Sequence, residues 1–389
     1  MKDESKKRKP YKKKRFTVPI IIIVILVLFR IFLPYIVKNY VNGVLADIPG
    51  YYGQVKDIDI SLIRGAYVID SLYLNTVKGE SQIPLINLGI ADISIEWKSL
   101  IKGKIVSEIE MTRPQFNYVF EDQAADTVAE ADVEVWTKAL TDLVPIDINN
   151  LKIIDGKASF LQIEADPNID LYIENIDLIA TNLRNVDRGD AELPSELHAT
   201  AISIGEGQVK LDGKMDIVKE IPDMDIGFSL ENATVTALND FTNYYAGIDF
   251  ARGNFNLYSE FAIAEGFLTG YIKPLLKDSK LIEKEDKFLE KLWEGFVGFF
   301  KFILKNQGNN TLATKVPIEG DLNALETKIL PTVLNVFKNA FISAYKGDTD
   351  NTVTFEDAEA KGKSNTTKSD RKEERRQKRA ERKAEKKKN

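Results

Sequence analysis

The residues of this sequence that could do chemistry are carboxylate pairs in strand-like segments. Asp57 and Asp59 lie two positions apart, as do Asp223 and Asp225, so each pair places two carboxylates on one face of a strand. Such pairs could bind a metal ion or serve as the acid and base of a glycosidase. Alternating polar positions on a solvated sheet face explain them fully, and this is the interpretation we adopt.

The groups that most catalytic and cofactor sites use are scarce in this chain. It contains no cysteine, which excludes disulfides, thiolate metal sites and cysteine nucleophiles. The only histidine, His198, lies in a presumed strand, where a structural role is far more common than general-base catalysis. Gly205-Glu206-Gly207 is too short for a nucleotide-binding fingerprint, and no other catalytic or phosphate-binding motif is present. We therefore predict that the protein is not an enzyme and has no catalytic, cofactor-binding or metal-binding residues.

The net charge of −6 conceals three regions of different charge. Residues 1–15 carry nine basic and two acidic side chains, and residues 361–389 carry fourteen basic and five acidic ones. The rest of the chain holds 30 basic and 52 acidic side chains, which makes it strongly acidic. Because an acidic body repels nucleic acid, we expect no nucleic-acid partner.

An apolar segment near the N-terminus predicts a membrane-spanning helix. Residues 16–37 contain a single charge, Arg30, and a helix of this length reaches about 33 Å, enough to cross a hydrocarbon layer of about 30 Å. Basic residues precede the segment and only Lys38 follows it closely, so the N-terminus is expected in the cytoplasm and the rest of the chain beyond the membrane. A cleavable signal peptide is the alternative, but the segment is long and lacks a small-residue cleavage site.

Beyond Pro49-Gly50 the pattern changes to alternating apolar and polar residues. Runs rich in Val, Ile, Leu and Tyr, separated by Gly, Pro and Asp, predict successive antiparallel strands. Arg113-Pro114 is expected to join two of them, and Lys273-Pro274 to end another. Asp155-Gly156 predicts a hairpin turn, a signal that Asp212-Gly213 repeats. The expected strand segments are 55–62, 67–74, 85–95, 104–111, 115–120, 146–163, 170–180, 196–204, 208–217, 223–231, 253–263, 266–272 and 313–322.

Four segments beyond the membrane span have helical spacing, namely 133–143, 233–246, 284–305 and 325–345. The segment 284–305 has an unusually aromatic face, which could lie on a membrane, fill one end of a lipid-lined groove, or cover the sheet as ordinary core. From about residue 347 the chain is polar.

These patterns predict an α+β fold dominated by antiparallel β, an elongated curved sheet or groove with covering helices that follows one N-terminal transmembrane helix. The expected parts are a basic segment 1–15, a membrane anchor 16–37, a β-rich domain 47–346, and a disordered or partly helical basic tail 347–389.

Several short sequence motifs, each present once, follow one another over roughly residues 16–346. They are Val55-Lys56-Asp57-Ile58, Arg64-Gly65-Ala66-Tyr67, Trp97-Lys98-Ser99-Leu100, Gly103-Lys104-Ile105-Val106, Arg113-Pro114-Gln115-Phe116, Ile153-Ile154-Asp155-Gly156-Lys157, Ala180-Thr181-Asn182-Leu183, Leu238-Asn239-Asp240-Phe241, Tyr244-Tyr245-Ala246, Tyr258-Ser259-Glu260, Gly270-Tyr271-Ile272-Lys273-Pro274, Ala313-Thr314-Lys315-Val316-Pro317-Ile318-Glu319-Gly320-Asp321 and Asn339-Ala340-Phe341. As a series they resemble a membrane-anchored branch of the AsmA-like group of bacterial envelope proteins.

The resemblance implies one inner-membrane helix, a periplasmic curved sheet folded into a groove, and a part in phospholipid movement or lipid homeostasis of the envelope. It offers no catalytic residue and no cofactor to carry over. A groove of this kind would hold acyl chains against inward-facing apolar side chains, for which the candidates are Ile58, Ile60, Leu72, Leu74, Ile153 and Phe160.

Two further expectations concern partners and the rival function. Membrane phospholipids are the expected ligand, and the basic tail could reach anionic headgroups, lipopolysaccharide or other envelope proteins. The alternative is a structural scaffold of the cell envelope whose apolar sheet face is closed by its own helices.

Overall fold

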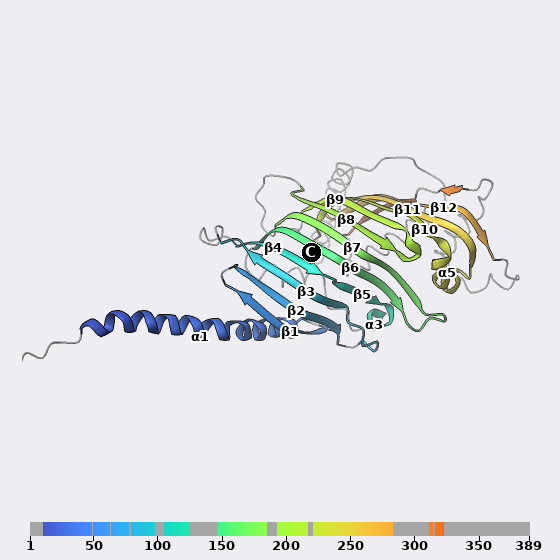
Figure 1. Ribbon diagram of the computed structural model, residues 1–389. Helices are drawn as coiled ribbons and strands as arrows, with labels where there is room; N and C mark the ends of the chain where they lie inside the picture. The colour runs from blue at the N-terminus through green and yellow to red at the C-terminus, as the bar shows by residue number, and fades with distance from the viewer. Residues whose placement is uncertain are drawn as a thin grey trace, which may run out of the picture.

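The computed structural model of the protein is a large curved sheet with one long helix leaving its N-terminal end (Figure 1). This confirms the predicted α+β fold dominated by antiparallel β and preceded by an apolar N-terminal helix. The structure describes residues 11–48, 50–62, 64–77, 79–97, 105–124, 146–184, 193–216, 221–282, 311–313 and 316–322.

The described residues form fourteen strands of one sheet. The strands are β1 (Tyr51–Ser61), β2 (Ala66–Thr76), β3 (Ile86–Ile95), β4 (Ile105–Thr112), β5 (Gln115–Val119), β6 (Ile146–Gln162), β7 (Ile169–Arg184), β8 (Ser195–Ser203), β9 (Gln208–Asp216), β10 (Asp223–Thr234), β11 (Phe250–Ala264), β12 (Phe267–Leu281), β13 (Thr311–Ala313) and β14 (Val316–Asp321). The helices are α1 (Tyr11–Ala46), α3 (Phe120–Ala124) and α5 (Asn239–Ala246), with 3₁₀ turns η2 (Ile204–Glu206) and η3 (Val235–Leu238).

Strand order in the sheet follows chain order, with neighbours antiparallel except around β6. β4 and β5 share one position in the sheet, because both pair with β3 on one side and run parallel to β6 on the other. The expectation that Arg113-Pro114 joins two successive antiparallel strands is therefore wrong. Arg113 takes a φ of 54° and interrupts the strand without reversing the chain.

One predicted hairpin turn lies inside a strand instead, and a second Asp-Gly pair lies inside the strand in which it was expected. Asp155-Gly156 falls within β6, where Asp155 has a φ of 56° and the register with β7 shifts between Ile153 and Gly156. Asp212-Gly213 falls within β9, in regular register with both neighbours. An Asp-Gly pair favours a positive φ, which a β-bulge uses as readily as a hairpin turn does.

Bulges also account for the curvature of the sheet. Asn175 in β7 and Asn232 in β10 take φ values of 51° and 60°, and each coincides with a register shift to the neighbouring strand. A bulge bends its strand and increases the local twist. Together with the bulge at Asp155, these positions bend the long central strands of the sheet (Figure 1).

β12 does not end at Lys273-Pro274 as expected but continues to Leu281. Pro274 lies between the part of β12 that pairs with β14 and the part that pairs with β13. A missing backbone N–H is tolerated at such a gap in the ladder, so the proline does not break the strand.

The predicted helices are only partly described. Of segment 233–246, the first residues end β10 and the remainder forms η3 and α5. The predicted strand 313–322 is present as β13 and β14. The predicted helices 133–143, 284–305 and 325–345 and the basic tail lie outside the described residues.

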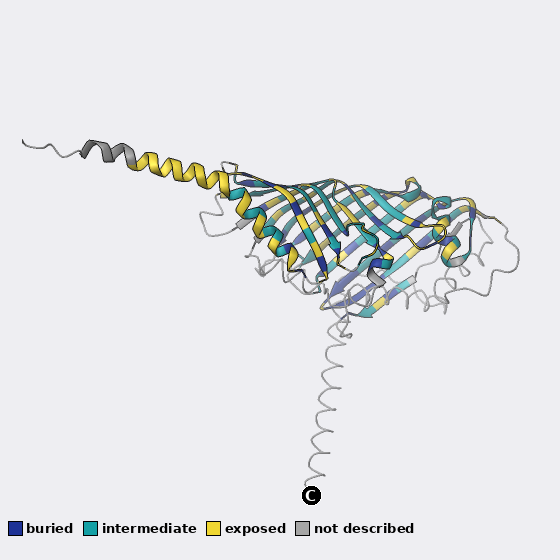
Figure 2. Cartoon of the chain, turned by 90° about the horizontal axis from the view of Figure 1, so that it is seen from below, coloured by how far each residue is buried: buried dark blue, intermediate teal, exposed yellow. Residues whose placement is uncertain are grey.

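Helix α1 contains the predicted span and extends beyond it. Its stretch Val18–Ala46 is long and apolar enough to cross a membrane. Residues 18–32 of the helix are exposed (Figure 2). Leu33, Val37, Val41 and Leu45, on its second half, pack against β1–β3. The helix ends before Pro49-Gly50, where Gly50 has a φ of 79°. One continuous helix therefore connects the apolar span to the sheet.

Some glycines of the sheet have no room for a Cβ atom and others do, and this difference predicts how alanine substitutions affect stability. A Cβ on Gly213 would lie 2.7 Å from the backbone carbonyl oxygen of Asp225, which cannot move without shifting the strand, and 2.3 Å from Ile226 Cδ1. We therefore expect Gly213→Ala to lower the free energy of unfolding by about 1–3 kcal/mol. On Gly227 the nearest atom to such a Cβ is the Asp212 carbonyl oxygen at 3.8 Å, so Gly227→Ala is the matched control. Thermal denaturation of both variants measures the difference, and equal losses would contradict this packing.

Candidate functional site

One face of the sheet carries apolar side chains from its first strands to its last. Because residues paired across neighbouring strands point to the same face, the register identifies rows that cross the whole sheet. One row consists of Ile60, Tyr67, Ile93, Ile109, Leu151, Ala180, Leu197, Gly213, Ile226, Phe261, Gly270 and Ile318. No residue in this row is charged.

A second row runs parallel to the first on the same face. It consists of Ile58, Ile69, Ala91, Met111, Ile153, Leu178, Ala199, Leu211, Phe228, Ser259 and Ile272. Ser259 is the one polar member, and its hydroxyl donates a hydrogen bond of 2.8 Å to the Tyr271 carbonyl oxygen. We call the face that these two rows define the apolar face.

The opposite face of the sheet, here the polar face, is charged along the equivalent row. That row consists of Asp59, Val68, Asp92, Glu110, Lys152, Ile179, His198, Asp212, Gly227, Glu260, Tyr271 and Pro317. Neighbours within it form ion pairs, such as Lys152 with Glu110 at 3.2 Å. The sheet is thus amphipathic over its full width, with one face suited to water and the other to hydrocarbon.

Helix α1 covers the N-terminal end of the apolar face. Its second half, with β1–β3, forms a closed hydrophobic cluster, the α1 cluster, whose buried members are Leu45, Ile48, Tyr51, Val55, Ile58, Ile60, Ile69, Leu74, Leu85 and Ala91. Asn42 on α1 accepts a hydrogen bond of 2.7 Å from the backbone N–H of Val55. This hydrogen bond satisfies one backbone N–H of the edge strand β1. Unpaired backbone groups of an edge strand can pair with another chain and cause aggregation.

The six residues predicted to line a groove all lie on the apolar face but divide into two groups. Ile58, Ile60 and Leu74 are 2%, 8% and 1% exposed within the α1 cluster, and Leu72 packs against it. Ile153 and Phe160 lie beyond the helix and are half-buried. The structure therefore brings the first group together as core under α1, and it places the second group on the central strands.

An aromatic group lies near the end of the apolar face where β5 and β6 meet. Phe160 on β6 stacks on Tyr118 of β5, with ring centroids 5.8 Å apart, and Phe120 at the start of α3 contacts the same ring. Burial raises the pKa of Tyr118, so its phenol remains a neutral donor at ordinary pH. This end of the face is therefore apolar and uncharged.

The carboxylates singled out in the sequence do not form a shared site. Asp57 and Asp59 are exposed on β1, and Asp57 accepts a 2.9 Å hydrogen bond from the N–H of Ile58. Asp223 is buried and accepts a 2.9 Å bond from the N–H of Glu265, whereas Asp225 is exposed. Among the described residues, no group of three or more acidic or histidine side chains could hold a metal ion.

His198 and Asp225 both belong to the polar face. His198 Nδ1 pairs with Asp212 on the neighbouring strand, as expected for paired polar residues on a solvated sheet. Partial desolvation of its carboxyl group, with Glu260 nearby, raises the pKa of Asp225 although the residue is exposed, while Lys214 opposes that shift. These contacts are those of ordinary charged residues on a solvated sheet surface.

Several residues of the apolar face were missed by the sequence reasoning. Leu178, Leu211, Phe228 and Phe261 extend it over β7–β11. The alternation in segments 170–180, 208–217 and 223–231 contained this signal, but it did not indicate which strands are neighbours.

Comparisons with known proteins leave the family of this chain open. No family model matches the sequence, and no curated protein matches it significantly. The description of the site therefore depends on its geometry alone.

Proposed function

We propose that this protein is a membrane-anchored, non-catalytic protein that binds phospholipid acyl chains along the apolar face of its sheet, and so helps to hold or move lipid in the cell envelope. The observation that carries the proposal is the pair of uncharged rows that cross the sheet from β1 to β12 and beyond. Burial of hydrocarbon contributes about 0.8 kcal/mol per CH₂ group. An acyl chain that lies along such a row would therefore bind with a large favourable free energy.

The place of α1 supports a role next to a membrane. Its exposed apolar half would span the inner membrane, with the basic segment 1–15 in the cytoplasm and the sheet in the periplasm, as the positive-inside rule favours. Leu33 and Val37, the last apolar turns of that span, already contact the α1 cluster. The helix would therefore hold the N-terminal end of the sheet beside the membrane surface, with no linker between them.

The rival function is a structural scaffold with a closed core. The α1 cluster favours this alternative for β1–β3, because its side chains are nearly inaccessible there. The half-buried side chains of the central strands, such as Ile153 and Leu178, favour lipid binding instead. The scaffold function therefore predicts that the central residues contact other parts of the chain, whereas the lipid function predicts that they contact lipid.

Photo-cross-linking at two adjacent residues of β7 tests the proposal in the native membrane. Leu178 points to the apolar face, whereas Ile179 points to the polar face and is 50% exposed. With p-benzoylphenylalanine at position 178, irradiation of cells is expected to give a phospholipid adduct that mass spectrometry detects on the purified full-length chain. The same photoreactive residue at position 179 is the matched control and should give no lipid adduct.

The outcome separates the two functions. Adducts at position 178 alone support lipid on the apolar face. If neither position yields lipid, and position 178 instead cross-links within the chain, the central face is closed core and the scaffold function holds.

A further inference from the structure

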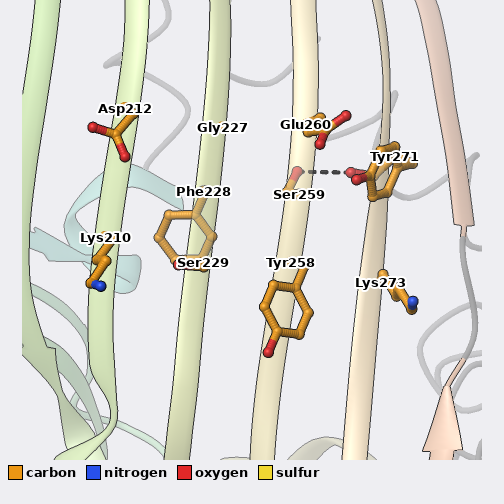
Figure 3. A pocket seen from close by; sticks show the side chains of 10 residues that line it. All are labelled: Lys210, Asp212, Gly227, Phe228, Ser229, Tyr258, Ser259, Glu260, Tyr271 and Lys273. Atoms are coloured by element: carbon orange, nitrogen blue, oxygen red, sulfur yellow. Dashed lines mark hydrogen bonds between the residues drawn. The ribbon is translucent and has the colours of Figure 1, made fainter. Parts of the chain in front are cut away.

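The polar face contains a hollow that the proposed lipid function does not use. It lies over β9–β12, is open to solvent and has a volume of about 440 Å³ (Figure 3). This volume is within the range of small-molecule sites, which begins at about 300 Å³. Its floor is at Gly227, between Asp212 and Glu260 on the neighbouring strands.

Gly227 is not required by the packing of the sheet. A Cβ on Gly227 would lie 3.8 Å from its nearest neighbour, whereas a Cβ on Gly213 or Gly270 would lie 2.7 Å or 2.5 Å from a backbone carbonyl oxygen. Its φ is not in the left-handed region either. A side chain at this position would fill the hollow without disturbing the fold, so the glycine keeps the space open.

A row of basic and aromatic residues crosses the hollow. Lys210 pairs with Ser229, Ser229 with Tyr258 and Tyr258 with Lys273, so the two lysines stand at opposite ends, three strand spacings or about 14 Å apart along the sheet. Figure 3 shows Tyr258 between them. The Tyr258 hydroxyl donates a 3.2 Å hydrogen bond to Glu231, which fixes the orientation of its ring.

These two lysines differ from other lysines of the polar face. Lys56, Lys152 and Lys214 pair with Asp70, Glu110 and Glu196 at 3.7, 3.2 and 3.9 Å. Within the part of the chain that the structure describes, Lys210 and Lys273 form no ion pair. Two cations without an ion-pair partner, one at each end of the hollow, can therefore bind anionic groups of a ligand.

The middle of the hollow has a different chemistry from its ends. Asp212, held by His198, and Glu260, bonded to Tyr271, present carboxylate oxygens on either side of Gly227. They can accept hydrogen bonds from hydroxyl groups, while they repel a ligand that is negatively charged along its whole length. Tyr258 offers a ring on which a flat apolar surface can stack.

From these contacts we infer that the hollow over β9–β12 binds a saccharide of about two rings that carries one anionic group at each end. Lys210 and Lys273 bind the two anions, Tyr258 stacks on a sugar ring, and Asp212 and Glu260 accept hydrogen bonds from ring hydroxyls. The site lies on the opposite face of the sheet from the proposed lipid surface, so the two functions do not depend on each other.

Calorimetric titration of the full-length protein in nanodiscs tests this inference with trehalose 6,6′-bisphosphate, a disaccharide with a phosphate on each ring. We expect it to bind at least 10-fold more tightly than trehalose or inorganic phosphate. Gly227→Leu should abolish binding without lowering the melting temperature. Lys210→Gln and Lys273→Gln should each weaken binding about 10-fold, because each removes one charge-assisted contact.

Lys214→Gln is the matched control, since this lysine lies on the same strand as Lys210 but outside the hollow and is already paired with Glu196. It should leave binding within 2-fold of the wild type. Absence of binding by the wild type, or full binding by a folded Gly227→Leu variant, would overturn the inference. Equal affinity for inorganic phosphate would mean that the lysines attract an adventitious ion only. Photo-cross-linking of lipid at position 178 should be unchanged in every variant, which separates this result from the lipid proposal.

Discussion

Replacing Ile153 by aspartate is expected to remove lipid from the protein while leaving the sheet folded. Ile153 lies at the centre of an apolar row, between Met111 and Leu178, and its side chain is half-buried. A carboxylate there would face bound hydrocarbon, and an unpaired charge against hydrocarbon is costly. Without lipid the same carboxylate reaches water, so the fold should lose only about 1–2 kcal/mol.

Lipid extraction and mass spectrometry of the purified protein measure this effect, together with thermal unfolding. Ile179→Asp is the matched control, because Ile179 is on the polar face of the next strand and is half exposed. It should change neither the lipid content nor the stability. Should Ile153→Asp unfold the protein instead, the central face is closed core and the lipid proposal is wrong.

Replacing Ile58 by aspartate should have the opposite result, with loss of the folded N-terminal part of the sheet. Ile58 belongs to the same apolar row as Ile153, but it is 2% exposed beneath α1. The substitution removes a buried aliphatic side chain, which costs about 2–5 kcal/mol, and also buries a carboxyl group with no partner. Limited proteolysis of β1–β3 in the intact protein should reveal the loss.

The pH dependence of that loss has a definite sign. Burial raises the pKa of an introduced carboxyl group above that of the unfolded chain, so its charged form destabilises the folded state. The defect of Ile58→Asp is therefore expected to grow as the pH rises above about 4 and to be smallest in acid, where the group is neutral in both states. Asp57→Asn, at an exposed neighbouring position, is the control and should be close to neutral. A stable Ile58→Asp variant at pH 7 would show that α1 does not close this end of the sheet.

The contrast between Ile58 and Ile153 also shows what the sequence could not predict, namely which part of the apolar face a helix covers. Both residues stand in alternating runs, and alternation correctly indicated that each points to an apolar face. Alternation reports only the period of a strand. Whether a helix lies over that face depends on contacts between segments distant in the chain, such as those that place α1 over β2 and β3.

The same reason explains the errors at turns. Asp155-Gly156 and Arg113-Pro114 have the local chemistry of chain reversal, yet the first lies inside β6 and the second interrupts the strand without reversing the chain. In β6 the pairing with strands on both sides outweighs the local preference, and a bulge accommodates the positive φ at Asp155. Tertiary pairing thus overrides a preference worth only a fraction of the sheet's total stability.

The sequence by itself determined the apolar helix, the strand-rich composition and the face on which each candidate residue lies, because these follow from local composition and periodicity. Only the tertiary structure decided which strands are neighbours, and hence that single apolar residues join into rows across the sheet. It also decided that α1 covers Ile58 but not Ile153, and that Gly227, Lys210 and Lys273 surround one hollow. These features arise from contacts between residues far apart in the chain, which no local pattern specifies.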